Sequence, residues 1–175
     1  MRRWWGAGLF FLLCLALVGP CQATTLNELK VGVRVFDFMT APPRGRLSLA
    51  IIHDGQNKAS LDDALAIQGW LNSGVSSVKA ELIPVLVDAR QLDDNPGYRI
   101  AIVAGGTGAY FDRILDYALK NRTLTISADL ACIRDGKCAV GIASTPRVEV
   151  VINRAVTSAC WVEFTEAFRM MVREF

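Results

Sequence analysis

Short apolar runs of strand length alternate along this chain with longer segments whose apolar residues recur at helical spacing. The runs at 47–52, 81–87, 98–104 and 123–127 have the length and composition of buried strands. Strands that alternate with helices pair mostly in parallel, because each helix carries the chain back to the edge where the next strand begins. The sequence therefore predicts a single α/β domain, a sandwich with a central, mostly parallel sheet flanked by helices.

Start and stop residues place the helices of this domain. Thr25 and Glu28 form a capping-box pattern at the start of a first helix, which ends at the prolines at 42–43. A second helix is predicted to begin with Ser60 and Asp63, and Thr107 is predicted to cap a third. The residues at 93–97 (DDNPG) are typical of a turn between two strands.

The C-terminal part of the chain favours a β-hairpin and a last apolar helix. Residues 132–138 (CIRDGKC) are predicted to form a hairpin with Gly136 in the left-handed conformation, which sets Cys132 opposite Cys138 at a distance that suits a disulfide. The alternative is two free structural thiols. A strand at 148–152 and a short helix at 154–159 follow.

The last helix is expected to begin near Thr165. It brings Phe168, Met171, Val172 and Phe175 onto nearby faces. We expect Phe168, Met171 and Phe175 to provide an interaction surface.

The first residues resemble a secretory signal peptide. Arg2 and Arg3 precede an apolar core at 9–18, and small residues lead up to Ala23. We expect cleavage after Ala23, so that residues 1–23 are removed and residues 24–175 form the domain in the periplasm. A retained anchor, or a lipoprotein modified at Cys21, are the alternatives.

Composition narrows the classes of function. Removal of Arg2 and Arg3 leaves 17 basic and 17 acidic residues, a balance that does not favour nucleic acid as a partner. The single histidine, His53, excludes a zinc site built from several histidines, and no metal or other cofactor is predicted. Cys160 has no evident cysteine partner. We expect it to be buried, with a redox-sensitive or intermolecular thiol as the alternative.

Two loops that follow predicted strands are candidate ligand-binding sites. His53 and Asp54 follow the first strand, and ligands of open α/β sheets bind at such carboxyl ends. Gly105, Gly106 and Thr107 join a later strand to a helix, where backbone N–H groups can hold an anion. A polar loop and a tight turn explain the same residues equally well. No catalytic residues are predicted, and we do not expect an enzyme.

Several soft motifs together resemble a known family. They are the helix that ends at 35–38 before prolines, the strands at 124–127 and 148–153, the hairpin through Gly136, and an alanine-containing turn before a final apolar helix. In these features the chain is similar to the YfiR-like periplasmic proteins, small exported bacterial α/β domains. The resemblance covers nearly all of residues 24–175.

The resemblance implies a regulatory role. The best-known family member represses a membrane-bound diguanylate cyclase, lowers cyclic-di-GMP output and responds to the redox state of its disulfides. The Cys132–Cys138 pair matches the position of a family disulfide, whereas Cys160 stands where the family usually has glycine and the ending at 168–175 is atypical. The implied partner is a membrane-bound signalling protein, the sensor part of a cyclase, and a homodimer is a further candidate assembly. The alternative hypothesis is a small-solute-binding periplasmic domain related to one lobe of a transporter's binding protein.

Overall fold

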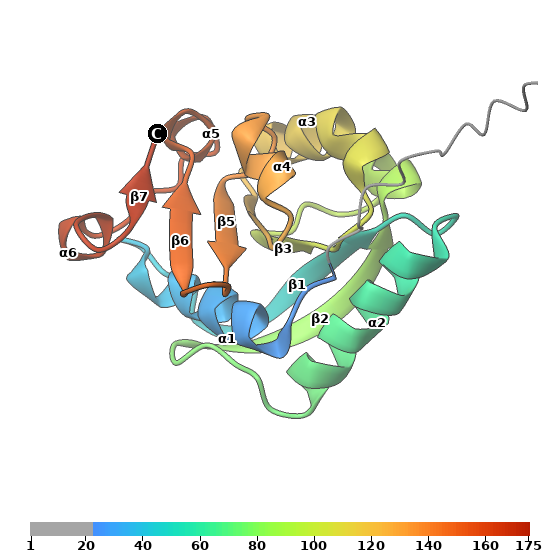
Figure 1. Ribbon diagram of the computed structural model, residues 1–175, viewed down its shortest axis with the longest axis horizontal. Coiled ribbons are helices and arrows are strands. Elements are labelled where there is room, and N and C mark those ends of the chain that lie inside the picture. Colours follow the sequence, from blue (N-terminus) through green and yellow to red (C-terminus); the bar gives the residue numbers. More distant parts are fainter. Residues whose placement is uncertain (1–22) are drawn as a thin grey trace, which may run out of the picture.

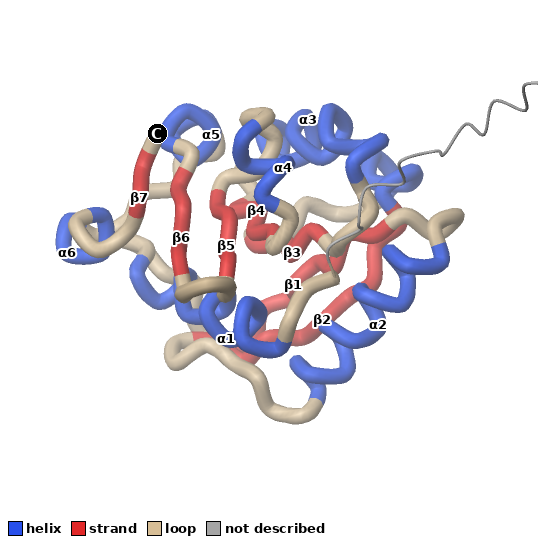
Figure 2. Tube along the Cα trace, in the orientation of Figure 1, coloured by secondary structure: helices blue, strands red, loops and turns tan. Residues whose placement is uncertain are grey.

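A computed structural model describes residues 23–175, which form one seven-stranded sheet in the order β2-β1-β3-β4-β5-β6-β7 (Figures 1 and 2). Neighbouring strands are parallel throughout except for the antiparallel pair β5 and β6. The predicted α/β class and mostly parallel sheet are confirmed. The strands are β1 (Gly45–His53), β2 (Ala80–Asp88), β3 (Ile100–Val103), β4 (Leu124–Ser127), β5 (Val140–Ala143), β6 (Glu149–Ile152) and β7 (Arg173–Glu174).

Helices cover both faces of this sheet. α1 (Leu26–Val35) and α2 (Lys58–Asn72) pack on one face, and α3 (Phe111–Asn121) and α4 (Leu130–Arg134) pack on the other (Figure 1). Each face of the sheet has its own apolar core. Alternate residues of β1 point into different cores, Leu49 and Ile51 into the core under α1 and α2, and Ala50 and Ile52 into the core under α3 and α4. The remaining helices are α5 (Arg154–Ala159), α6 (Glu166–Arg169) and the 3₁₀ turns η1 (Phe36–Phe38), η2 (Ala89–Asp94) and η3 (Gly108–Tyr110).

The capping residues of the first three helices were predicted with mixed success. The Thr25–Glu28 capping box is present at α1, as predicted. α2 instead begins at Lys58, because the side chain of Asn57 caps it, and Ser60 accepts a hydrogen bond from the backbone N–H of Asp54. The hydroxyl of Thr107 donates to the carbonyl of Ala104, so it does not cap α3.

The predicted hairpin at 132–138 is wrong, although its disulfide is present. Asp129 caps α4, which holds Cys132, and the chain then turns back through Gly136 at φ +71°. This turn brings Cys132 and Cys138 to a Cα–Cα distance of 5.3 Å in a disulfide. The C-terminal hairpin lies further on and consists of β5 and β6, of which the sequence analysis had missed β5.

The predicted last helix is also shorter than expected. α6 ends at Arg169, and the chain then extends into β7, which pairs in parallel with β6. Glu174 of β7 accepts hydrogen bonds from the guanidinium of Arg169, which favours this turn over a longer helix. Met171 and Phe175 therefore do not lie on one helical face.

Among residues 23–175, none of the helices has the length and apolar character needed to cross a membrane.

Candidate functional site

Two predicted loops do meet at one edge of the sheet. The strand order 2-1-3-4-5 reverses direction between β1 and β3, and the carboxyl ends of these two strands carry His53–Asp54 and Gly105–Thr107. The side-chain amide of Asn57 donates to the carbonyl of Gly106 at 3.2 Å and ties the two loops together. The structure thus places the predicted residues at the position where this class of sheet binds ligands.

At this edge of the sheet, a carboxylate of the protein itself accepts a hydrogen bond from the glycine loop. The carboxylate of Asp63, on α2, accepts a hydrogen bond from the backbone N–H of Gly105 at 2.7 Å. The same carboxylate accepts from the backbone N–H and the hydroxyl of Thr24 at 2.8 and 3.0 Å. The sequence pattern predicts Asp63 at the start of a helix, and nothing in that local pattern indicates a long-range contact.

His53 is a buried side chain at this edge that lacks a hydrogen-bond partner. It is 8% exposed, and its Nδ1 has no hydrogen-bond partner among the described residues. Asp88 lies beside it in the β1–β2 register. The guanidinium of Arg90 donates hydrogen bonds to the Asp88 carboxylate and lowers its pKa to about 2. Asp88 is therefore a carboxylate that already has a cationic partner.

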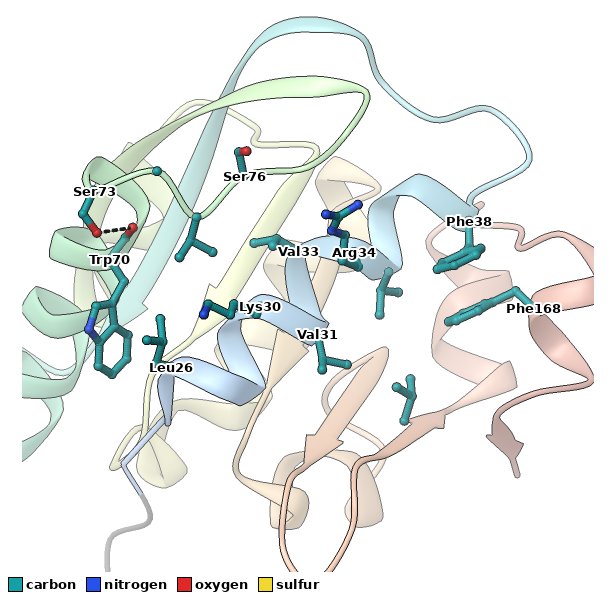
Figure 3. A pocket seen from close by; sticks show the side chains of 14 residues that line it. Leu26, Lys30, Val31, Val33, Arg34, Phe38, Trp70, Ser73, Ser76 and Phe168 are labelled. Carbon is teal, nitrogen blue, oxygen red and sulfur yellow. Dashed lines mark hydrogen bonds between the residues drawn. The ribbon is translucent and has the colours of Figure 1, made fainter.

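A hollow lies away from this edge, on the side of the sheet that α1 covers. Its volume is about 670 Å³, within the range of small-molecule sites, and its walls are mostly apolar (Figure 3). We call it the α1 groove. Its lining residues are Leu26, Lys30, Val31, Val33, Arg34, Val35, Phe38, Trp70, Ser73, Gly74, Val75, Ser76, Val150 and Phe168.

Two cationic side chains line this apolar groove. Lys30 and Arg34 lie one turn apart on α1, and Figure 3 shows them between Trp70 at one end and Phe38 at the other. Neither forms a salt bridge with any residue of the described chain. The groove therefore combines apolar walls with two positive charges that have no acidic partner in residues 23–175.

A second hollow adjoins the α1 groove. Its volume is about 690 Å³, and it shares Phe38, Val150 and Phe168 with the α1 groove. The rings of Phe38 and Phe168 stack with centroids 4.5 Å apart, and both rings line both hollows. The second hollow is lined further by Arg147, Val148, Glu149, Met171, Val172 and Arg173.

The three residues of the predicted interaction surface do not all lie together. Phe168 is buried and lines both hollows, Met171 lines the second, and Phe175 is half exposed and lines neither. The contributions of the basic residues of α1 and of Trp70 to the α1 groove are not among the predicted site residues. The repeat of Lys30 and Arg34 on one side of an amphipathic helix was the available signal.

The cysteines lie in the core. Cys132, Cys138 and Cys160 have no exposed surface. Burial raises the pKa of the Cys160 thiol to about 11, which keeps it protonated and unreactive. Within the described residues, no group of three or more His, Cys, Asp or Glu side chains gathers as a metal site would require.

Comparisons with known proteins bear on the fold. No protein-family model matches the chain, and neither does any curated protein. Among solved structures, a conserved domain protein from Vibrio cholerae is similar to it with a TM-score of 0.59 and 6% identity, and covers 85% of this chain. An ABC domain in complex with L-Trp from Streptococcus pneumoniae has a TM-score of 0.59 and 8% identity over 84% of this chain.

A third similar structure is the ligand-free, open form of a substrate-binding protein with adhesive properties from Clostridium difficile. Its TM-score is 0.58 at 10% identity, over 87% of this chain. The matched region spans only 58–60% of the three solved chains. At such identities the similarity shows the α/β fold alone.

Proposed function

We propose that this protein is an exported binding protein that holds a small apolar ligand bearing an acidic group in the α1 groove. The observation that carries the proposal is the combination of an apolar hollow of about 670 Å³ with the charges of Lys30 and Arg34. A carboxylate that approaches this groove would form charge-assisted hydrogen bonds with both cations, while its hydrocarbon part would leave water.

The aromatic side chains define the shape of such a ligand. Trp70 and Phe38 lie at opposite ends of the groove and offer ring surface to a flat or aliphatic group (Figure 3). The similar folds of a substrate-binding protein and of an ABC domain in complex with L-Trp support this class of function over repression of a cyclase. The predicted signal peptide supports a role outside the cytosol.

A thermal-shift assay with matched ligands tests the proposal. Indole-3-propionate and octanoate would each be compared with their neutral amides, because a ligand that binds only the folded state raises the melting temperature. We expect the carboxylates to raise it and the amides to do so less. Equal responses to acids and amides, or no response to either, would contradict an anion-binding groove.

Charge-reversal variants test whether the rise in melting temperature depends on the α1 groove. Lys30→Glu with Arg34→Glu reverses both groove charges, whereas Lys120→Glu reverses an exposed charge on α3, on the other face of the sheet. We expect the double substitution to abolish the carboxylate response and the Lys120 substitution to preserve it. A response that survives in the double variant would place the ligand elsewhere, with the edge near His53 and Gly105 as the next candidate.

A protein partner is the second candidate, and the continuity of the two hollows favours it. Together they form a longer apolar surface than one small ligand would fill, and Met170 and Met171 lie exposed beside it. The resemblance to YfiR-like proteins proposes a membrane-bound diguanylate cyclase as that partner. Deletion of the gene would then raise cellular cyclic-di-GMP, and restoration with the Lys30→Glu/Arg34→Glu variant would fail to lower it. An unchanged cyclic-di-GMP level after deletion would remove this candidate.

A further inference from the structure

Asp63 is a buried carboxylate whose partners come from the first residues of the described chain. It is 5% exposed and accepts three hydrogen bonds, two of them from Thr24 and one from the backbone N–H of Gly105. Thr24 is itself 6% exposed, whereas Ala23 beside it is exposed. Thr24 thus occupies a fixed position among α2 and the β3–α3 turn.

The charge of Asp63 has no balancing cation in the described structure. None of the salt bridges formed within residues 23–175 includes Asp63. A buried carboxylate without a positive partner is costly, even when amide groups donate to it. The atom that lies 2.8 Å from its Oδ1 is the backbone nitrogen of Thr24, the residue that follows the predicted cleavage site.

We propose that cleavage of the Ala23–Thr24 peptide bond creates the missing cation, and that Asp63 is the receptor for the new N-terminus. Hydrolysis by a signal peptidase adds the hydroxyl of water to the carbonyl carbon of Ala23 and hydrogen to the nitrogen of Thr24. The released α-amine, with an ordinary pKa of about 8, takes a further proton from solvent at neutral pH. The amide that donates one hydrogen bond to Asp63 thereby becomes an ammonium group that pairs with it.

The pair connects processing to the edge of the sheet that carries Gly105. Asp63 also holds the N–H of Gly105, at the point where β1 and β3 diverge. A charged N-terminus at Thr24 therefore stabilises the start of α1, α2 and the β3–α3 turn together. This inference rests on cleavage after Ala23 and is independent of what binds in the α1 groove.

Two chains that differ by one residue test the pair, since every helix and strand of the described fold follows Thr24. One chain begins at Thr24 and the other retains Ala23, which carries the ammonium one residue further out into solvent. We expect the folding equilibrium constant of the Thr24 chain to be roughly tenfold higher at pH 7, because an ion pair replaces a hydrogen bond in which only the carboxylate is charged. Equal stability of the two chains would overturn the proposal.

The Asp63→Asn substitution shows whether the carboxylate is the cause. Asparagine keeps an acceptor oxygen but removes the charge, so the difference between the two starts should disappear. A difference that persists at full size in Asp63→Asn would contradict the assignment. The pairing raises the pKa of the Thr24 amine, so the advantage should be complete below about pH 8 and be lost as the pH rises through the raised value.

The reactivity of the α-amine gives a second measurement, which does not require the Asp63→Asn variant to fold. Limited acylation near pH 7.5, read by mass spectrometry, should modify the α-amine of the Thr24 chain at least tenfold more slowly than that of the chain that retains Ala23. Equal rates would overturn the buried pair. The mass of the exported protein provides the remaining check, because a start at any residue other than Thr24 would contradict the inference while leaving the proposed groove function in place.

Discussion

The disulfide between Cys132 and Cys138 should provide a measurable part of the stability of the domain. It closes a loop with a sequence separation of 6, for which the chain-entropy relation gives about 2 kcal/mol at 25 °C. A domain of this size shifts its melting temperature by about 2–4 °C per kcal/mol. Reduction should therefore lower the melting temperature by about 4–8 °C.

Thermal unfolding with and without reductant measures this shift on one and the same chain, with the thiol count verified by mass spectrometry. The Cys132→Ser/Cys138→Ser variant should melt at one temperature whether or not reductant is present. The Cys160→Ala variant should keep the full response, because Cys160 is a buried free thiol. If the oxidised and fully reduced chains melted at the same temperature, the reasoning from loop closure would be refuted.

Three further predictions concern the groove and the sheet edge. Lys30→Glu with Arg34→Glu should weaken carboxylate binding roughly 10-fold or more in isothermal titration. Each exposed charge pair contributes about 0.2–1 kcal/mol, and reversal of the charges adds repulsion. The control Lys120→Glu should leave the affinity unchanged. Phe168→Ala should lower the free energy of unfolding by about 3–5 kcal/mol in urea titration, because a buried ring is lost, and a loss under 1 kcal/mol would contradict its place in the core. Asp88→Asn should lower the free energy of unfolding at neutral pH. Because the pKa of Asp88 is lowered to about 2, the difference in stability from the parent chain should persist from neutral pH down to about 4 and disappear as the pH falls through 2. A difference that disappears near pH 5 would be inconsistent with the Arg90 contact.

The pattern of apolar residues predicted most of the sheet because the strands are local runs. The runs at 47–52, 81–87 and 98–104 appear as β1, β2 and β3, since a buried parallel strand shows in the sequence as a nearly continuous apolar segment. β5 is not predicted because Gly141 interrupts its short apolar run. That glycine lies close against Ile133 of α4, a long-range contact that no local pattern reveals.

The failed predictions share a cause, which is competition from side-chain contacts. Residues 132–138 have a spacing that suits a hairpin, yet Asp129 caps a helical turn that takes in Cys132. Both the spacing of a hairpin and the cap of a helix are visible in the sequence, and the helix buries Cys132 and Ile133 in the apolar core that α3 also covers. In the same way, the contact between Arg169 and Glu174 ends α6 early.

The candidate site was predicted in part. The loops at His53 and Gly105 do lie at the diverging strands, since the carboxyl ends of parallel strands share one edge. The contacts of Asp63 with Thr24 and Gly105 join residues 39 and 42 positions apart in sequence, and the spacing of apolar residues does not predict such contacts. The α1 groove likewise brings together residues from α1, α2, β6 and α6, so it exists only in the folded chain.

The binding of an apolar anion in the α1 groove is tested most directly by NMR titration of the chain with indole-3-propionate. The indole N–H of Trp70 and the amides of Lys30 and Arg34 should shift together and saturate with a single dissociation constant, while the exposed Trp161 stays unchanged. Shifts confined to His53 and Gly105–Gly106, or no saturable shift at all, would contradict the account.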